Sequence, residues 1–258
     1  MRNRASPGFP TCNLSVPGTR LSESGVRRRS DRIFDYDLLM KPLQFAPSLV
    51  EQVHKSILSD ITTGKLPSGA RIIQEQIAQE LGVSRQPVQQ ALTLLRKEGV
   101  LRDAPGRGLL VAPLDLEHVR NMYDVRAVIE GLAFRKAAEN ADRLAPDKAA
   151  ALMRAGRKAA SSGSVGAMIA ADMAFHHYIY TLSGNPLVVP TMETHWTQAQ
   201  RVMGQVLLRE HKPRDIWNQH EALLDAVSSG KAALAERLAR QHITEAADFM
   251  IERLQTEA

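Results

Sequence analysis

Residues 76–92 read QIAQELGVSRQPVQQAL, and this stretch decides the fold of the N-terminal half. Ala78 is small enough for two helices to cross closely, Gly82 permits a tight turn, and Val83 supplies an apolar side chain to cover the core. Small, flexible and apolar residues in this order are typical of a helix-turn-helix, the motif that inserts its second helix into the major groove of DNA.

The second helix of this motif is predicted from about Arg85 to Glu98, with Ser84 at its N-cap position and Gly99 just past its end. Its apolar residues follow the i, i+3, i+4, i+7 spacing of one helix face: Val88, Ala91, Leu92 and Leu95. The opposite face carries hydrogen-bond donors and no acidic residue: Arg85, Gln86, Gln89, Gln90, Thr93, Arg96 and Lys97. This face is suited to contact phosphates and base edges.

The flanking segments complete a winged helix-turn-helix. Apolar residues recur every four positions over 49–61, as in an amphipathic helix, and a short helix is expected over 74–81. Residues 100–102 and 109–111 are predicted to pair as a hairpin with Arg107 at its tip, between two glycines. The candidate DNA-contacting residues are therefore Arg85, Gln86, Gln89, Thr93 and Arg107.

Charge is divided unevenly along the 258 residues. Residues 1–44 hold eight Lys or Arg and four Asp or Glu, residues 45–113 hold eight and six, and residues 114–258 hold seventeen and eighteen. The basic excess thus lies entirely before residue 114, as expected when the front of a chain binds a polyanion. We expect a disordered basic tail over 1–44, a DNA-binding domain over 45–113 and a second domain over 114–258.

The second domain is predicted to be an all-α bundle, so the fold class is mainly α. Six helical segments separated by Pro, Gly and Ser breakers are expected: 115–140, 146–161, 165–183, 186–209, 214–229 and 231–256. Seven of the eight histidines lie in this part. The single cysteine excludes an intrachain disulfide, and the chain has no apolar run of 18 residues, which argues against a membrane span.

Four polar residues are predicted to point into this bundle. Asp172 and His176 share one helix face, and His220 and His242 each follow the apolar stripe of a later helix. Buried polar groups need partners, and one divalent metal ion would satisfy all four. Three nitrogens and one oxygen suit zinc best, with nickel, manganese or iron as alternatives. Ordinary hydrogen-bonded core histidines are the competing interpretation.

The front domain resembles the winged helix-turn-helix of the GntR family of bacterial transcription regulators. The resemblance is carried by the matching segments LPSG at 66–69, LGVSR at 81–85, PV at 87–88, AL at 91–92 and GRG at 106–108. The family usually has Arg-Glu where this chain has Gln89-Gln90, so the operator sequence cannot be transferred.

Residues 115–258 resemble the FCD domain, the effector-binding bundle of the FadR subfamily, and six helices are similar to its VanR-like branch. Members that bind metal carry Asp-x-x-x-His and two later histidines. The resemblance implies that Arg126 helps to hold a carboxylate ligand and that Asn185, in a Gly-Asn-Pro turn, contacts it. For Arg126 the alternative is an i, i+4 salt bridge with Glu130, and for Asn185 it is a helix-connecting turn.

Together these features predict a cytoplasmic, homodimeric repressor that a small organic acid releases from double-stranded operator DNA. A metal-dependent hydrolase with a DNA-binding appendage is the main rival, but no His-Glu-x-x-His motif supports it. A regulator whose metal is purely structural is the third possibility.

Overall fold

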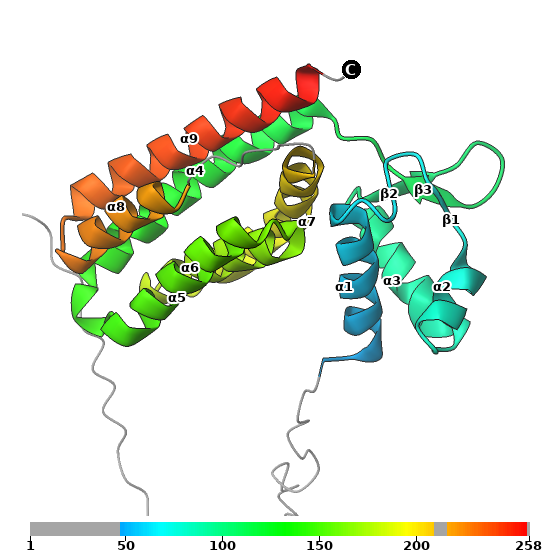
Figure 1. Cartoon of the computed structure of the whole chain (residues 1–258), viewed down its shortest axis with the longest axis horizontal. Coiled ribbons are helices and arrows are strands. Elements are labelled where there is room, and N and C mark those ends of the chain that lie inside the picture. Colours follow the sequence, from blue (N-terminus) through cyan, green and yellow to red (C-terminus); the bar gives the residue numbers. More distant parts are fainter. Residues whose placement is uncertain (1–46, 209–215, 257–258) are drawn as a thin grey trace, which may run out of the picture. The chain divides into compact units, whose positions relative to one another are not determined.

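The computed structural model describes residues 47–208 and 216–256, so the predicted tail over 1–44 lies outside the described residues. Residues Phe45–Ala258 form one compact unit. The described part of that unit contains a small three-stranded sheet and nine α-helices, which are labelled in Figure 1. The prediction of a mainly α fold is confirmed.

The first part contains α1 (Leu49–Thr62), α2 (Gln74–Glu80) and α3 (Arg85–Lys97). Ser48 begins α1 with a capping box, in which its hydroxyl accepts from the Glu51 N–H and the Glu51 side chain accepts from the Ser48 N–H. The apolar face of α3 is fully buried against α1, as predicted: Val88, Ala91, Leu92 and Leu95. Ser84 occupies the N-cap position of α3 but makes no side-chain capping hydrogen bond.

The sheet has one more strand than the sequence indicated. Strands β2 (Leu101–Asp103) and β3 (Leu109–Val111) form the predicted hairpin, and β1 (Arg71–Ile72) pairs antiparallel with the other side of β3. A two-residue strand is too short for its side-chain alternation to be recognised. The additional strand places Arg71 beside the hairpin, where its guanidinium donates to the Pro105 carbonyl in the loop between β2 and β3.

The second part is the predicted six-helix bundle. Its helices are α4 (Leu116–Glu139), α5 (Pro146–Ser162), α6 (Val165–Leu182), α7 (Val188–Leu207), α8 (Trp217–Ser228) and α9 (Ala232–Gln255), with a short 3-10 turn at Ala141–Arg143. Asp115 caps α4 by accepting from two backbone N–H groups, and α4 packs along α9 (Figure 1). The buried apolar residues form two clusters, one around Met192 and Ile243 and the other around Phe134 and Phe175.

A buried arginine on α7 bonds to the backbone that surrounds the sheet. Arg201 is 2% exposed, and its guanidinium donates to the carbonyls of Gly99 and Ala112. On the same helix, the Gln198 amide donates to the Glu98 carbonyl, at the C-cap of α3. A cation near the carboxyl end of a helix is favourably placed in the helix dipole. Burial lowers the pKa of Arg201 to about 10.

Candidate metal centre and DNA-reading face

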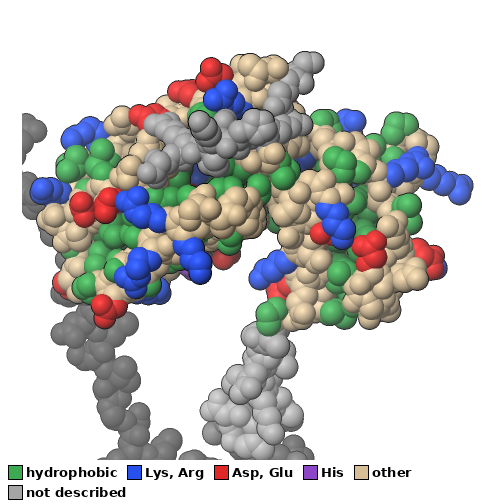
Figure 2. Space-filling model, viewed as in Figure 1, with side chains coloured by type: hydrophobic (Ala, Val, Ile, Leu, Met, Phe, Trp, Pro, Cys, Tyr) green, Lys and Arg blue, Asp and Glu red, His purple; other side chains and the backbone are tan. Residues whose placement is uncertain are grey.

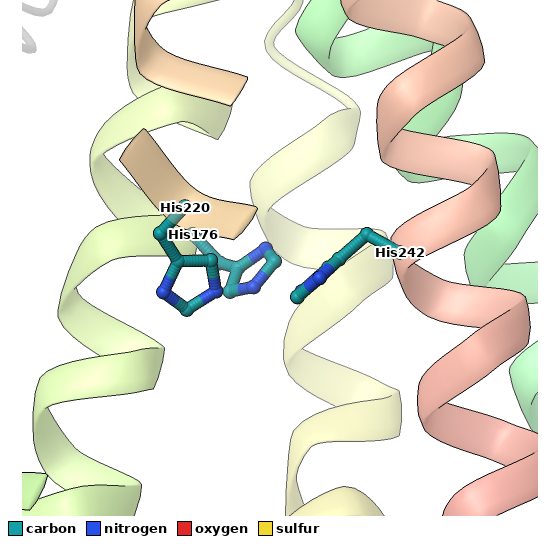
Figure 3. A group of neighbouring side chains, drawn as sticks. All are labelled: His176, His220 and His242. Carbon is teal, nitrogen blue, oxygen red and sulfur yellow. The ribbon is translucent and has the colours of Figure 1, made fainter. Parts of the chain in front are cut away.

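Three histidines from three helices meet inside the bundle. His176 on α6, His220 on α8 and His242 on α9 are at most 5% exposed, and each can offer one ring nitrogen within 4.8 Å of the others. Figure 3 shows the three rings directed toward one another. The sequence predicted that these residues point inward, and the structure places them together.

Asp172, the fourth predicted ligand, borders the same group. It lies one helical turn before His176 and is 7% exposed. Its Oδ1 is 3.4 Å from His220 Nε2 and 3.9 Å from His176 Nε2. Burial raises the pKa of this carboxyl, against the opposing charge of His176. One carboxylate oxygen therefore faces two imidazoles, an arrangement that can surround a cation.

The electrostatics of the three rings differ because their neighbours differ. Burial lowers the pKa of His220 well below its usual value, and the charges of His242 and His176 lower it further. Burial likewise lowers the pKa of His242 to about 3. Burial would also lower the pKa of His176, but the carboxylates of Glu130 and Asp172 outweigh burial and raise it. Two of the three rings are thus held neutral, the form in which imidazole binds a metal.

The hydrogen bonding of His220 fits a metal ligand. Its ring is stacked on Phe175 with centroids 4.4 Å apart and meets Trp217 edge-on at 4.6 Å. Both ring nitrogens are buried, and neither has a hydrogen-bond partner among the described residues. An unsatisfied buried polar group costs about 1–3 kcal/mol, so this ring is better explained by a ligand than by packing alone.

His242 makes a contact of the kind that orients metal ligands. Its Nδ1 is 2.9 Å from the Gln219 Oε1, an oxygen that can only accept. The proton therefore belongs on Nδ1, which leaves the lone pair on Nε2. Gln219 is itself held by a hydrogen bond from its amide nitrogen to Glu245. The sequence analysis did not identify Gln219, although it lies directly before His220.

Arg126 forms the salt bridge that the sequence analysis considered as an alternative. The guanidinium is 3% exposed, and its Nε and Nη2 donate to Glu130 Oε1 at 3.0 and 2.8 Å. It also lies 4.8 Å from the Tyr123 ring centroid and 5.1 Å from that of Trp196. Trp196 is in turn 6.0 Å from the His176 ring, so Arg126 lies near the histidine group.

Asn185 acts in the turn before α7. Its Oδ1 accepts a hydrogen bond from the Leu187 N–H, and its own N–H donates to the Ser183 hydroxyl. These bonds agree with the helix-connecting turn that was the alternative interpretation. No contact between Asn185 and the three histidines appears within the described part of the chain.

The predicted DNA-contacting residues are exposed on the first part of the chain. Arg85, Gln86, Gln89 and Thr93 all lie on the solvent side of α3, and Arg107 lies on the loop between β2 and β3. Figure 2 shows Lys and Arg side chains exposed on the part of the molecule that contains α1–α3 and the sheet. Arg85 is paired with Glu75 of α2, and the Thr93 hydroxyl donates to the Gln89 carbonyl.

The structure adds Arg71 to this face. Arg71, Arg85 and Arg107 line one hollow between the wing and the start of α3. Glu75, the partner of Arg85, also lines this hollow, so Arg71 adds to the positive charge that would face a phosphate backbone. The signal that could have identified Arg71 is its position two residues after the family-like segment at 66–69.

An exposed helix-turn-helix with a basic wing, joined to a helical bundle with a buried polar centre, defines the class of DNA-binding transcription regulators. Comparison with known families supports this class. The family described as "Bacterial regulatory proteins, gntR family" matches residues 49–111, and the FCD domain matches residues 121–245. The chain belongs to the GntR family, with an FCD domain behind its DNA-binding domain, and is a regulator rather than an enzyme.

Individual relatives agree with this assignment. The chain is 25% identical over 196 residues to the "Probable D-xylose utilization operon transcriptional repressor" of Paenarthrobacter nicotinovorans, covering 76% of this chain and 86% of that protein. It is 23% identical over 195 residues to the repressor RspR of Escherichia coli, with the same coverages. Among solved structures, E. coli McbR/YncC has the same fold, with a TM-score of 0.70 at 22% identity over 81% of this chain and all of that one.

No helix in residues 47–208 and 216–256 combines the length and apolar character that crossing a bilayer requires.

Proposed function

We propose that the chain is a homodimeric repressor that leaves its operator when a small organic acid binds at a metal site in the bundle. Asp172, His176, His220 and His242 would hold the ion, with zinc as the best match to three nitrogens and one oxygen. The observation that carries the proposal is the buried His220 ring, whose two nitrogens have no hydrogen-bond partner among the described residues.

A bound divalent ion would supply a Lewis-acidic position for a carboxylate. Arg126 would hold the other side of the ligand's carboxylate. Its guanidinium has five N–H donors, and Nε and Nη2 share a single oxygen of Glu130. The rings of Tyr123 and Trp196 lie against the guanidinium. Asp172 and Glu130 would offset the positive charges of the ion and of Arg126.

The ligand would act on DNA binding through α4. This helix carries Arg126 and begins at Leu116, with four residues between it and the end of β3 at Val111. Because the connection is short, movement of α4 would change the position of the wing and α3. In a dimer that binds two half-sites, a change in their spacing weakens operator binding.

The metal site is tested by substituting one histidine on α8 and, as a control, one exposed histidine on α6. Purified wild-type protein should contain about one divalent ion per chain, measured by elemental analysis. His220→Ala should lose the ion, whereas His177→Ala should keep it, because His177 is exposed and directly follows a proposed ligand. Stoichiometric metal in His220→Ala would show that the ligand set is wrong.

The regulatory role is tested on DNA fragments selected by the wild-type protein from a random-sequence library. Arg85→Ala should lose specific binding and retain its metal. Carboxylic acids that release the wild-type complex should fail to do so after chelation if the ion takes part in sensing. If chelation unfolds the bundle, the metal has the purely structural role that was the third possibility.

A further inference from the structure

The buried carboxylate of Glu130 lies between His176, a proposed metal ligand, and Arg126, the proposed acid-binding residue. Glu130 lies on α4, is 0% exposed, and is not among the residues that the sequence pattern of ligands indicates. Its Oε1 accepts from Arg126, and its Oε2 lies 2.7 Å from His176 Nδ1. A carboxylate that is completely removed from water is costly unless opposite charges or donors surround it.

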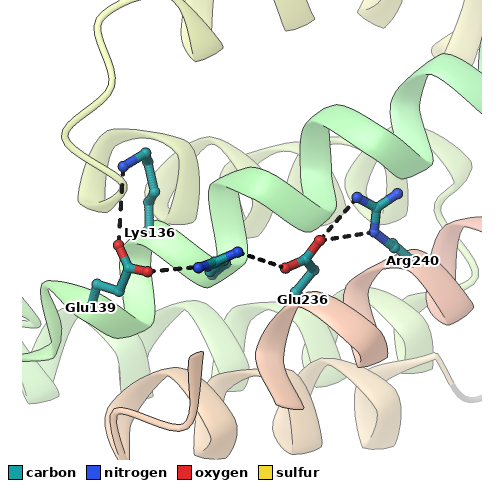
Figure 4. Close-up of polar contacts among 5 residues, drawn as sticks. Lys136, Glu139, Glu236 and Arg240 are labelled. Carbon is teal, nitrogen blue, oxygen red and sulfur yellow. Dashed lines mark hydrogen bonds and ion pairs between the residues drawn. The ribbon is translucent and has the colours of Figure 1, made fainter. Parts of the chain in front are cut away.

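The surroundings of Glu130 differ from those of a surface pair. Two nitrogens of Arg126 donate to its Oε1, and the His176 ring faces its Oε2, so a buried group lies against each carboxylate oxygen. An exposed i, i+4 pair on the same helix needs no such explanation: Arg135 and Glu139 are about half exposed and belong to the surface cluster in Figure 4.

The two nitrogens of His176 have different neighbours. Nδ1 faces Glu130, while Nε2 faces Asp172 at 3.9 Å, on the side of His220. Glu130 Oε2 and His176 Nδ1 are close but do not have hydrogen-bond geometry. A carboxylate this near to Nδ1 still favours the tautomer with the proton on Nδ1 and the lone pair on Nε2. Gln219 has the corresponding position beside Nδ1 of His242. Carboxylate or carbonyl partners behind metal-binding imidazoles fix the orientation of the ring and increase its basicity.

We propose that Glu130 is the positioning residue of this centre: it orients His176 for metal binding and, with its other oxygen, holds Arg126 near the histidine rings. This inference rests on the proposed metal site and deepens it. An exposed salt bridge such as Arg135–Glu139 would have no effect on the orientation of a metal ligand. The shared carboxylate also makes the metal-binding and acid-binding groups parts of one network.

The test compares two Glu→Gln substitutions on one helix. Full-length wild type, Glu130→Gln and Glu139→Gln are freed of metal with a chelator and titrated with Zn²⁺ against a chromophoric competitor. Glu130→Gln should bind Zn²⁺ about 10–100-fold more weakly than wild type, the range found for such outer partners. Glu139→Gln should match wild type, because its pair with Arg135 lies on the surface.

A second readout separates positioning from general loss of structure. Co²⁺ bound to wild type and to Glu139→Gln should give the same visible absorption spectrum, and Glu130→Gln should give an altered one. Glu130→Asp retains the charge at a shorter reach, so it should recover part of the Zn²⁺ affinity. If Glu130→Gln does not fold, the Glu130→Asp titration and its spectrum decide the question alone: values equal to wild type would refute positioning.

The possible failures are distinguishable. If wild-type protein itself binds no Zn²⁺ or Co²⁺, the proposed metal site is wrong, and the role of Glu130 falls with it. If wild type binds but folded Glu130→Gln has the same affinity and spectrum, the metal site stands and the positioning role is overturned.

Discussion

Gly156 of α5 lies where any larger side chain would collide with the wall of the proposed metal centre. A Cβ at this position would be 2.0 Å from Cζ2 and 2.1 Å from Cη2 of Trp217, far inside van der Waals contact. The Trp217 ring cannot easily retreat, because it is 2% exposed and packs edge-on against Phe175 and His220. We therefore expect Gly156→Ala to destabilise the bundle.

The size of the effect follows from two opposing contributions. Overpacking a well-filled core costs about 1–3 kcal/mol, and a collision this close belongs at or above the upper end. Alanine in a helix recovers about 1 kcal/mol relative to glycine. The net loss should be about 2 kcal/mol, which corresponds to a decrease of about 4–8 °C in Tm for a chain of this size.

The assay is thermal and urea-induced unfolding of chelated protein, with Gly166→Ala as the matched control. Gly166 is also helical, but the nearest atom to its added Cβ is Thr63 Cγ2 at 3.9 Å, an ordinary contact. Gly166→Ala should therefore be neutral or slightly stabilising. Because Trp217 touches His220, Gly156→Ala should also weaken Zn²⁺ binding. Equal stability of the two variants would refute the packing argument.

Three further outcomes follow from the structure. In urea unfolding, Zn²⁺ at 100 times its dissociation constant should raise the free energy of unfolding of wild type by about 2.7 kcal/mol. The same Zn²⁺ should leave the stability of His220→Ala unchanged. If wild type is not stabilised, the native fold has no metal site. In chelated protein, stability should decrease as the pH falls from 6.5 toward 3, because His220 and His242 have lowered pKa values in the fold and take up protons on unfolding. It should also decrease as the pH rises above 6.5, because the pKa of His176 is raised in the fold and its proton is lost there. A flat urea midpoint between pH 7 and 5 would contradict the acid effect. Arg107→Ala should weaken binding to all DNA sequences alike and reduce the salt dependence of log Kd by about one unit, whereas a loss confined to one operator would indicate base reading by the wing.

The parts of the fold with strong periodicity could be predicted from the sequence. The six bundle helices and the buried face of α3 follow apolar spacing and clear breakers, so their bounds agree within a few residues. Leu49 shows the limit of this reasoning, because it continues the stripe of α1 yet is 48% exposed at the helix start. Strand β1 was missed because two residues contain no period.

The candidate site was predictable in its ligands and not in their surroundings. Inward stripes place His176, His220 and His242 on buried faces, and convergence follows from bundle packing. Glu130 and Gln219 are invisible to such reasoning. A glutamate four residues after an arginine is usually a surface pair, and only the orientation of α4 against α6 shows that Glu130 reaches His176. Arg201 was missed for the same reason, because its partners are backbone carbonyls distant in sequence.

The polar centre divides the interior of the bundle between its two apolar clusters. His176 cannot be exchanged for an apolar side chain without removing the group that faces Glu130 Oε2, which would leave a buried carboxylate oxygen with one neighbour fewer. Evolutionary loss of this centre would therefore require several coordinated replacements on different helices.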